Sequence, residues 1–320
     1  IEKKIDSCDP DIVILSIEVW DLIQELNKKI SRKVAFGVIC HGMPFIGSPI
    51  KPGKSFIVGA KNFANMQTSN KIKNYIIKHY KELPDMSKRS ILIANNKTVG
   101  YYFKNYFPKS LIWEQAPHVT VDPVKLSKDP ELCYDFCYMA RMEKGKGVEY
   151  LNDLFNKISI NLGRKIKVAI MGRADDNHSQ EELEKLLRSN SKSYSIHYYG
   201  WADKNTKTKV FGASGCFIYP SVYDNFPTVV NEALAHGLPV AMWNCPFYNM
   251  SYLNIKSISA ATPFNIEELA LNAVNLFKKR TRISHYSINY IKGAGSSASV
   301  AKDDLLLFNK MIDYHERSKK

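Results

Sequence analysis

Two carboxylates lie eight residues apart in the stretch YPSVYDNFPTVVNEALAHGLPV, residues 219–240. A helix is expected to begin near Phe226, so Asp224 precedes it and Glu232 lies about two turns into it. The free N–H groups at a helix N-terminus favour a phosphate, and carboxylates accept hydrogen bonds from sugar hydroxyls. The pattern therefore indicates a site for a phosphorylated sugar. The structural alternative is that Asp224 or Asn225 caps the helix and Glu232 faces solvent.

A second group of charged residues lies in ARMEKGKGVEYL, residues 140–151. Arg141 follows an apolar strand-like run, and Lys146 and Gly147 precede a predicted helix. Arginine forms a bidentate fork with phosphate oxygens, whereas lysine acts as a point charge. We expect this loop to clamp a diphosphate. A solvated loop of mixed charge is the alternative.

Two further residues follow predicted strands. His41 comes directly after KVAFGVIC and could donate a hydrogen bond to a sugar hydroxyl, although a lone histidine is more often structural. Trp201 follows Gly200 and would either line a base pocket or pack against the fold.

The elements that must position these residues alternate between strand and helix from about residue 131. The predicted strands are LCYDFCYMA, KIKVAIMG, SIHYYGW, CFIYPS and LPVAMW, and the predicted helices are GVEYLNDLFNKI, SQEELEKLLRS, NTKTKVFGA, FPTVVNEALAHG and NIEELALNAVNLFKKR. Such alternation predicts an α/β fold with a parallel sheet. Ligands bind at the carboxyl ends of such strands, so both loops are expected to meet at one edge.

The first part of the chain alternates less cleanly. Its predicted strands are DIVILSI, KVAFGVIC, RSILIANN and LIWEQA, and its predicted helices are WDLIQELNKKI and TVGYYFKNYF. VTVDPVKLSKDPEL, with two prolines, is predicted to be a linker. A chain of 320 residues is long enough for two domains. We expect an N-terminal domain over 1–127, a C-terminal domain over 128–293 and a final helix over 294–320 that could pack on either domain, including back on the N-terminal one.

Together these strings resemble the retaining glycosyltransferases of family 4, whose GT-B architecture has two facing Rossmann-like domains with parallel sheets. ARMEKGKGV is similar to the family's Gly-Arg-Leu…Lys-Gly motif. The stretch from Gly200 to Val240 is similar to its acid-x7-acid motif, with Pro-Ser before it and Ala-x-Gly-x-Pro-Val after it. The resemblance covers 131–290 well and 9–130 loosely.

The resemblance implies a role for each motif residue. Arg141, Lys146 and the adjoining Gly147 would bind the donor diphosphate, and Glu232 the ribose hydroxyls. The donor sugar and β-phosphate would meet Asp224 and the backbone of Asn225, Phe226, Pro227 and Thr228, with His41 near the sugar. The catalytic set would be His41, Arg141, Lys146 and Asp224, and Trp201 would join the donor-binding set.

The implied activity is retaining transfer of a hexosyl group from a UDP- or GDP-sugar to a glycan, glycolipid, lipid-linked or other sugar acceptor. The one Asp-x-Asp string, Asp9-Pro10-Asp11, precedes a strand and lies at the wrong edge for a metal. We therefore predict a metal-independent enzyme without a cofactor. Two alternatives are a nucleotide-sugar binding protein without transferase activity and a GT-B nucleotide-sugar epimerase.

Three features depart from the family pattern. The first acid is Asp224 where the family usually has Glu, and Ala140 stands where it usually has Gly. The family's first strand and Gly-rich loop, which face the acceptor, are not found before DPDIVILS. We therefore expect an N-terminal domain that lacks them.

The net charge and the sequence patterns limit the classes of binding partner that are expected. The net charge of +14 suits an anionic membrane surface, a phosphorylated substrate or nucleic acid. The loop 42–61, with Lys51, Lys54 and Lys61, is a candidate for peripheral contact with an anionic membrane. Nucleic-acid binding is not expected, because aromatic and basic residues do not interleave. The absence of GxGxxG argues against a dinucleotide-dependent dehydrogenase.

The six cysteines indicate a reducing compartment. Cys133 and Cys137 are four residues apart in a predicted strand, roughly 13 Å, which is too far for a disulfide. We expect reduced, buried cysteines and a cytoplasmic protein, with the inner membrane face as an option.

Overall fold

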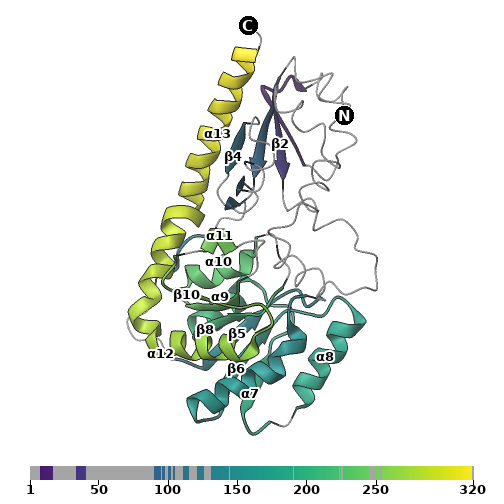
Figure 1. Ribbon diagram of the computed structural model, residues 1–320, viewed down its shortest axis with the longest axis vertical. Coiled ribbons are helices and arrows are strands. Elements are labelled where there is room, and N and C mark those ends of the chain that lie inside the picture. The colour runs from purple at the N-terminus through teal and green to yellow at the C-terminus, as the bar shows by residue number, and fades with distance from the viewer. Residues whose placement is uncertain are drawn as a thin grey trace.

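The computed structural model contains two parallel sheets joined by a short linker and a long C-terminal helix (Figure 1). The residues that the structure describes are 8–16, 34–40, 90–94, 96–97, 100–101, 104, 111–114, 121–125, 131–143, 145–189, 191–222, 224, 226–244, 249–252 and 254–318. Several predictions lie outside these residues, among them those for His41, Asn225, Cys245, the basic loop 42–61 and the helix WDLIQELNKKI.

The larger sheet has six parallel strands in the order β10-β9-β8-β5-β6-β7. The strands are β5 (Tyr134–Met139), β6 (Ile166–Met171), β7 (Tyr194–Tyr198), β8 (Ser214–Tyr219), β9 (Val240–Trp243) and β10 (Ile258–Ala261). The chain builds outward from β5 through β6 to β7, then returns to the other side of β5 with β8. A reversal of this kind is the point at which doubly wound sheets bind ligands. It lies between β5 and β8.

Helices cover both faces of this sheet. They are α7 (Leu151–Leu162), α8 (Asn177–Arg188), α9 (Lys204–Gly212), α10 (Thr228–Ala235), α11 (Asn249–Tyr252) and α12 (Ile266–Tyr290), with a 3-10 turn η2 (Val148–Tyr150) before α7. Local chemistry sets the ends: the side chains of Asp176 and Asp203 accept hydrogen bonds from the amides of Ser179 and Thr206 at the starts of α8 and α9. Gly163, at φ 68°, ends α7.

The smaller sheet has four parallel strands in the order β1-β2-β3-β4. They are β1 (Ile12–Ser16), β2 (Ala35–Cys40), β3 (Ser90–Ala94) and β4 (Ile112–Glu114). After a π-helical segment, η3 (Ile291–Gly295), helix α13 (Ser297–Ser318) leaves the larger sheet and runs along the smaller one (Figure 1). Leu307 and Met311 of α13 are buried with Ala35, Ile91 and Ile93.

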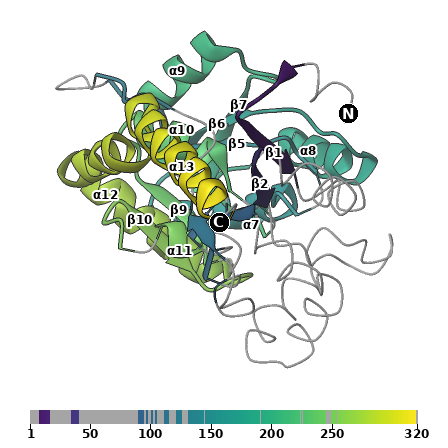
Figure 2. The ribbon, with the colours of Figure 1, turned by 90° about the horizontal axis from the view of Figure 1, so that it is seen from above.

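The linker between the sheets is tied to the second half of the chain. The Val121 amide donates to the Gly295 carbonyl over 3.0 Å, and the Val124 amide donates to the Ala235 carbonyl over 2.8 Å. Asp122 accepts from both the amide and the hydroxyl of Ser297 at the start of α13. Seen from above, the C-terminal end of α13 lies beside β2 (Figure 2).

The structure departs from the sequence predictions in three places. Helix α12 extends to Tyr290, ten residues past its predicted end at Arg280, because no glycine or proline interrupts it. Strand β10 and helix α11 were not predicted. The prediction of buried cysteines is wrong for Cys8 and Cys133, which are exposed, since β5 begins only at Tyr134 and Cys133 precedes it. Cys137 and Cys216 are buried and free.

Among the described residues, no helix combines the length and the apolar character needed to cross a membrane.

Candidate functional site

Two loops meet where the strand order reverses. One follows β5 and the other follows β8, and these strands are neighbours in the sheet. The Val222 amide donates to the Gly145 carbonyl over 2.8 Å, and the Ser221 hydroxyl donates to the same oxygen over 3.2 Å. Gly147 has φ 87°, and a Cβ built on it would lie 2.1 Å from the Pro220 carbonyl oxygen. Only a glycine lets the two loops approach this closely.

The two loops form one wall each of a cavity of about 360 Å³. Predicted site residues that line it are Arg141, Lys146, Trp201, Asp224, Phe226, Thr228 and Glu232. Arg141 and Glu232, from opposite ends of the predicted motifs, therefore share one cavity. Gly147 and Pro227 do not line it, but Gly147 sets the approach of the loops and Pro227 precedes the first residue of α10.

Each of the two acids is paired with a lysine. Lys146 Nζ lies 2.8 Å from Asp224 Oδ2, and Lys207 Nζ lies 2.5 Å from Glu232 Oε1. The Asp224 and Glu232 side chains are only 21% and 23% exposed. Partly buried charges need such partners because desolvation disfavours the ionised form. The cavity is thus lined by two cation–carboxylate pairs whose members can exchange partners with a ligand.

Arg141 lies at the more open side of the cavity. Its guanidinium is 2.9 Å from Glu143 and 3.4 Å from Asp175, and its side chain is 61% exposed. The hydrogen bond with Glu143 and the charge of Asp175 raise the pKa of Arg141 further above its usual range. The residue is a permanent cation that can swing toward an anionic ligand.

The N-terminus of α10 points its first turn at the same cavity. Thr228 and Val229 are the first helical residues and line the cavity. Pro227 precedes them, and no side chain of the described residues caps this helix. The Val230 amide donates to the Pro227 carbonyl over 3.0 Å, and the amides of Thr228 and Val229 precede it at the helix end that suits an anion. The predicted helix start near Phe226 is two residues early, so Asp224 precedes the helix by four residues.

An aromatic side chain, Trp201, also lines the cavity. Trp201 follows Gly200, lines the cavity and is 69% exposed. The Arg173 guanidinium lies 5.2 Å from the centre of its ring. Trp201 therefore lines the cavity, and its contact with a nucleotide base stays a prediction.

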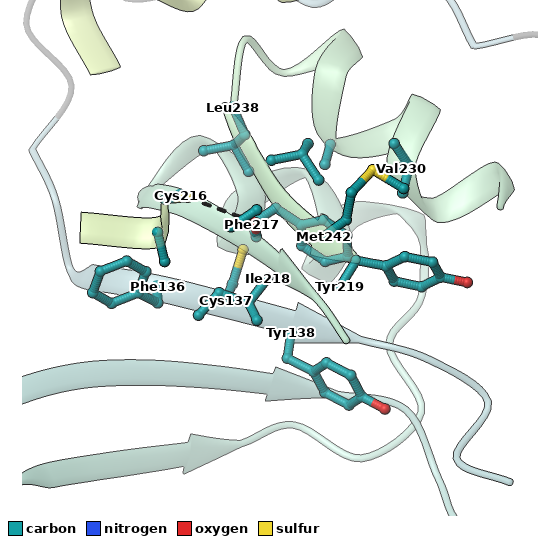
Figure 3. Packing of buried hydrophobic residues seen from close by; sticks show 14 of the residues in the cluster. Phe136, Cys137, Tyr138, Cys216, Phe217, Ile218, Tyr219, Val230, Leu238 and Met242 are labelled. Carbon is teal, nitrogen blue, oxygen red and sulfur yellow. Dashed lines mark hydrogen bonds between the residues drawn. The ribbon is translucent and has the colours of Figure 1, made fainter. Parts of the chain in front are cut away.

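Two tyrosines lie near the carboxyl ends of the strands that flank the reversal: Tyr219 is the last residue of β8, and Tyr138 is the last but one of β5. The Tyr138 and Tyr219 rings are buried, and Figure 3 shows their hydroxyl groups directed away from the apolar cluster. The Tyr138 hydroxyl donates to the Lys146 carbonyl over 3.2 Å, and the Tyr219 hydroxyl donates to Asp224 Oδ2 over 2.5 Å. Burial is the main cause that raises the pKa of both phenols, so both remain protonated donors.

Sequence reasoning missed Tyr219 and Lys207. Tyr219 stands in the motif itself, directly before Pro220 and Ser221, but its alternation in β8 suggests only a core position. Lys207 lies on α9, 25 residues before Glu232, and no local pattern links the two. The signal for Lys207 is the topology, which brings α9 and α10 to the same edge.

Comparison with known proteins identifies a family and a relative that is similar over part of its length. The family described as glycosyl transferases group 1 matches residues 127–289, or 163 of 320 residues. An uncharacterized glycosyltransferase of Methanocaldococcus jannaschii is 29% identical over 105 residues, which are 33% of this chain and 26% of that protein. This chain therefore spans about a quarter of that relative's length.

Two solved structures are similar in fold. Sucrose-phosphate synthase from Thermosynechococcus elongatus has a TM-score of 0.69 at 12% identity, covering 98% of this chain and 76% of its own. The pneumococcal O-GlcNAc transferase GtfA, in complex with UDP and GlcNAc, has a TM-score of 0.66 at 13% identity, covering 97% of this chain and 59% of its own. At such identities the likeness shows the fold alone, and it confirms the predicted GT-B class.

The matched residues 127–289 contain the loop with Arg141 and Lys146, the helix α10 and both acids of the cavity. They make up more than half of the chain. The protein belongs to the family of glycosyl transferases group 1.

Proposed function

We propose that this protein is a retaining, metal-independent hexosyltransferase of family 4 that takes its sugar from a nucleotide-sugar donor. One observation carries the proposal: a single cavity at the strand reversal brings together three cations, a helix N-terminus and two carboxylates. Cations and amides suit the diphosphate, and carboxylates suit hydroxyl groups on either side of it.

The diphosphate is the leaving group, so its developing charge must be stabilised. Lys146 is only 12% exposed and lies within the cavity, whereas Arg141 can reach in from its more open side. The amides at the start of α10 add a third source of positive potential. Groups fixed in advance around a developing charge contribute a large part of catalysis in comparable sites. The proposed metal independence depends on these three groups.

The proposed chemistry keeps the configuration at the anomeric carbon. The bond from that carbon to the diphosphate oxygen breaks, and the acceptor oxygen forms its bond on the same face. The acceptor proton passes to an oxygen of the departing diphosphate. Retention and this front-face route rest on the family 4 resemblance. No side chain is assigned as a nucleophile.

The positions of the two acids and of Trp201 suggest which residues would contact the ribose, the sugar and the base of the donor. Glu232, in the second turn of α10, would accept from the ribose hydroxyls, with Lys207 releasing its carboxylate or joining the contact. Asp224 would meet the sugar, and Trp201 the base. We propose a uridine or guanosine donor; UDP is the nucleotide bound in the similar pneumococcal transferase. The roles of His41 and Asn225 remain predictions.

A thermal-shift panel tests the proposal. UDP, GDP, ADP and their glucose, N-acetylglucosamine and mannose derivatives are each added to the protein at equal concentration. A ligand that binds only the folded state raises the melting temperature. At a ligand concentration of 100 times its dissociation constant, the free energy of unfolding increases by about 2.7 kcal/mol. We expect one nucleotide series to stabilise the protein without added metal. The absence of a shift with every nucleotide would contradict the proposal.

A second experiment separates transfer from its alternatives. The stabilising donor is incubated with an acceptor panel, and the anomeric configuration of the product is read by proton NMR. We expect the donor's configuration to be retained. Inversion would refute the mechanism, an epimerised donor without acceptor would indicate an epimerase, and binding without any turnover would indicate a binding protein.

A further inference from the structure

We propose that Tyr219 is a positioning residue that holds Asp224 and, through it, Lys146, in the arrangement that receives the donor diphosphate. The proposal rests on the proposed function for the identity of the ligand. It concerns the contacts that run from Tyr219, at the end of β8, through Asp224 to Lys146. It assigns a role to Tyr219 that the sequence motifs alone do not indicate.

The Tyr219 ring is a fixed point. It is the last residue of β8, is 1% exposed, and lies against Phe217 with ring centres 6.1 Å apart. A side chain packed on all sides in a dense core has little freedom to change rotamer. Tyr219 lines the cavity, and Figure 3 shows its hydroxyl directed away from the apolar cluster, so the position of this oxygen is set by the core of the larger sheet.

Asp224 needs such an anchor. It lies between β8 and α10, outside any regular element, so no helix or strand fixes its backbone. Its side chain is one methylene shorter than the glutamate that the family usually has here. The Tyr219 hydroxyl and Lys146 Nζ donate to the same oxygen, Oδ2, over 2.5 Å and 2.8 Å. Two donors on one oxygen define the direction of the carboxyl group.

Lys146 is in turn placed by Asp224. A lysine side chain has four rotatable bonds, and holding it in one geometry costs up to about 2 kcal/mol of side-chain entropy. The contacts of Asp224 with Tyr219 and Lys146 order the lysine side chain in the folded protein, so this entropy is lost on folding and not on ligand binding. Burial and the neighbouring Asp224 charge raise the pKa of Tyr219, so the phenol stays a donor wherever the protein is folded.

Tyr219→Phe removes only the hydroxyl and keeps the ring. We expect it to release Asp224 toward solvent, to loosen Lys146, and to weaken UDP binding by about tenfold, as for loss of a hydrogen bond to a charged group. The control is Tyr194→Phe, because Tyr194 is also buried and its hydroxyl also makes side-chain hydrogen bonds, with Asn152 and Ser189, but it does not line the cavity. Both variants should melt within a few degrees of each other, and only Tyr219→Phe should bind UDP more weakly.

A double-mutant cycle separates positioning from direct contact. Because Tyr219 lines the cavity, it could also touch the donor itself. If it acts through Asp224, then Tyr219→Phe should change UDP affinity by less than about twofold in an Asp224→Ala background, in which the acceptor is gone. An equal loss in both backgrounds would overturn the proposal, as would UDP binding by Tyr219→Phe that equals that of Tyr194→Phe.

A ligand-free measurement decides the same question if the protein does not bind UDP. Lysine acetylation by an amine-reactive ester is followed by peptide mass spectrometry, with Lys207 as the internal reference. Lys146 should react faster in Tyr219→Phe than in the wild type, and Lys207 should not change. Unchanged Lys146 reactivity would overturn the positioning role, whereas failure of UDP to bind the wild type would count against the proposed function alone.

Discussion

At the scale of single residues, the cavity is built from charges that already have partners. Lys146 with Asp224 and Lys207 with Glu232 form two pairs that are mostly shielded from water. A diphosphate that enters would take over Lys146, while the ribose would take over Glu232. In the proposed function, the donor would replace the existing partners of these charged side chains. Its binding would therefore not require the desolvation of unpaired charges.

Lys146→Ala tests the cation at the centre of this exchange. Removing one preorganised contact costs about 3–4 kcal/mol in comparable charge-stabilising sites, so donor turnover should fall by roughly two orders of magnitude or more. The measurement is the initial rate of nucleotide release from the donor. Lys157→Ala is the control, because Lys157 is also paired with a glutamate, Glu267, but at the surface of α7. Unchanged turnover in Lys146→Ala would rule out its assigned role.

At the scale of elements, the site depends on how closely two loops approach. The carboxyl ends of β5 and β8 are adjacent, but their loops meet only because Gly147 has no side chain and adopts φ 87°. The contact of Val222 and Ser221 with the Gly145 carbonyl then joins the loops. The cationic loop and the start of α10 are therefore held as one unit.

Gly147→Ala should disrupt this unit. Its Cβ would lie 2.1 Å from a backbone oxygen, which cannot move aside as a side chain could, so we expect a loss of more than about 4 kcal/mol in the free energy of unfolding. Gly163→Ala is the matched control: φ is 68° there, and no described atom lies within 4 Å of the new Cβ. It should lose only about 1–2 kcal/mol. Urea denaturation measures both, and equal losses would show that backbone strain, not the clash, dominates.

Much of the larger sheet could be predicted from sequence because each element carries its own signal. The strand before Arg141, the strand that ends at Tyr219 and the helix that carries Glu232 all follow from local periodicity and from Pro227 and Gly237. Strand β10, four residues long, is too short for a periodic signal. The pairing of Lys207 with Glu232 and the anchor of Asp224 on Tyr219 arise only when distant elements fold together, so no local pattern reveals them.

At the scale of the whole molecule, one helix connects the two sheets. Helix α13 starts beside the linker, where Asp122 accepts from Ser297, and continues along the smaller sheet. Leu307 and Met311 bury their side chains against β2 and β3. The smaller sheet thus depends on residues more than 200 positions later in the chain.

Leu307→Ala should therefore weaken the smaller sheet. Leu307 is fully buried, and truncation of a buried leucine costs about 2–5 kcal/mol. The neighbouring Leu306 is 50% exposed, so Leu306→Ala should change the free energy of unfolding by less than about 0.5 kcal/mol. Thermal and urea unfolding of both variants provide the comparison. Equal stabilities would mean that α13 does not support the sheet.

The central claim is that the loops after β5 and β8 together hold the diphosphate of a nucleotide-sugar, and hydrogen–deuterium exchange tests it most directly. Exchange is measured by mass spectrometry with and without the nucleotide that stabilises the protein most. We expect slower exchange in peptides that cover 140–150 and 220–232, because bound amides open less often. Residues 208–215 and 236–239 lie around the amino ends of β8 and β9, away from the two loops. Protection confined to peptides that cover those residues would contradict the prediction.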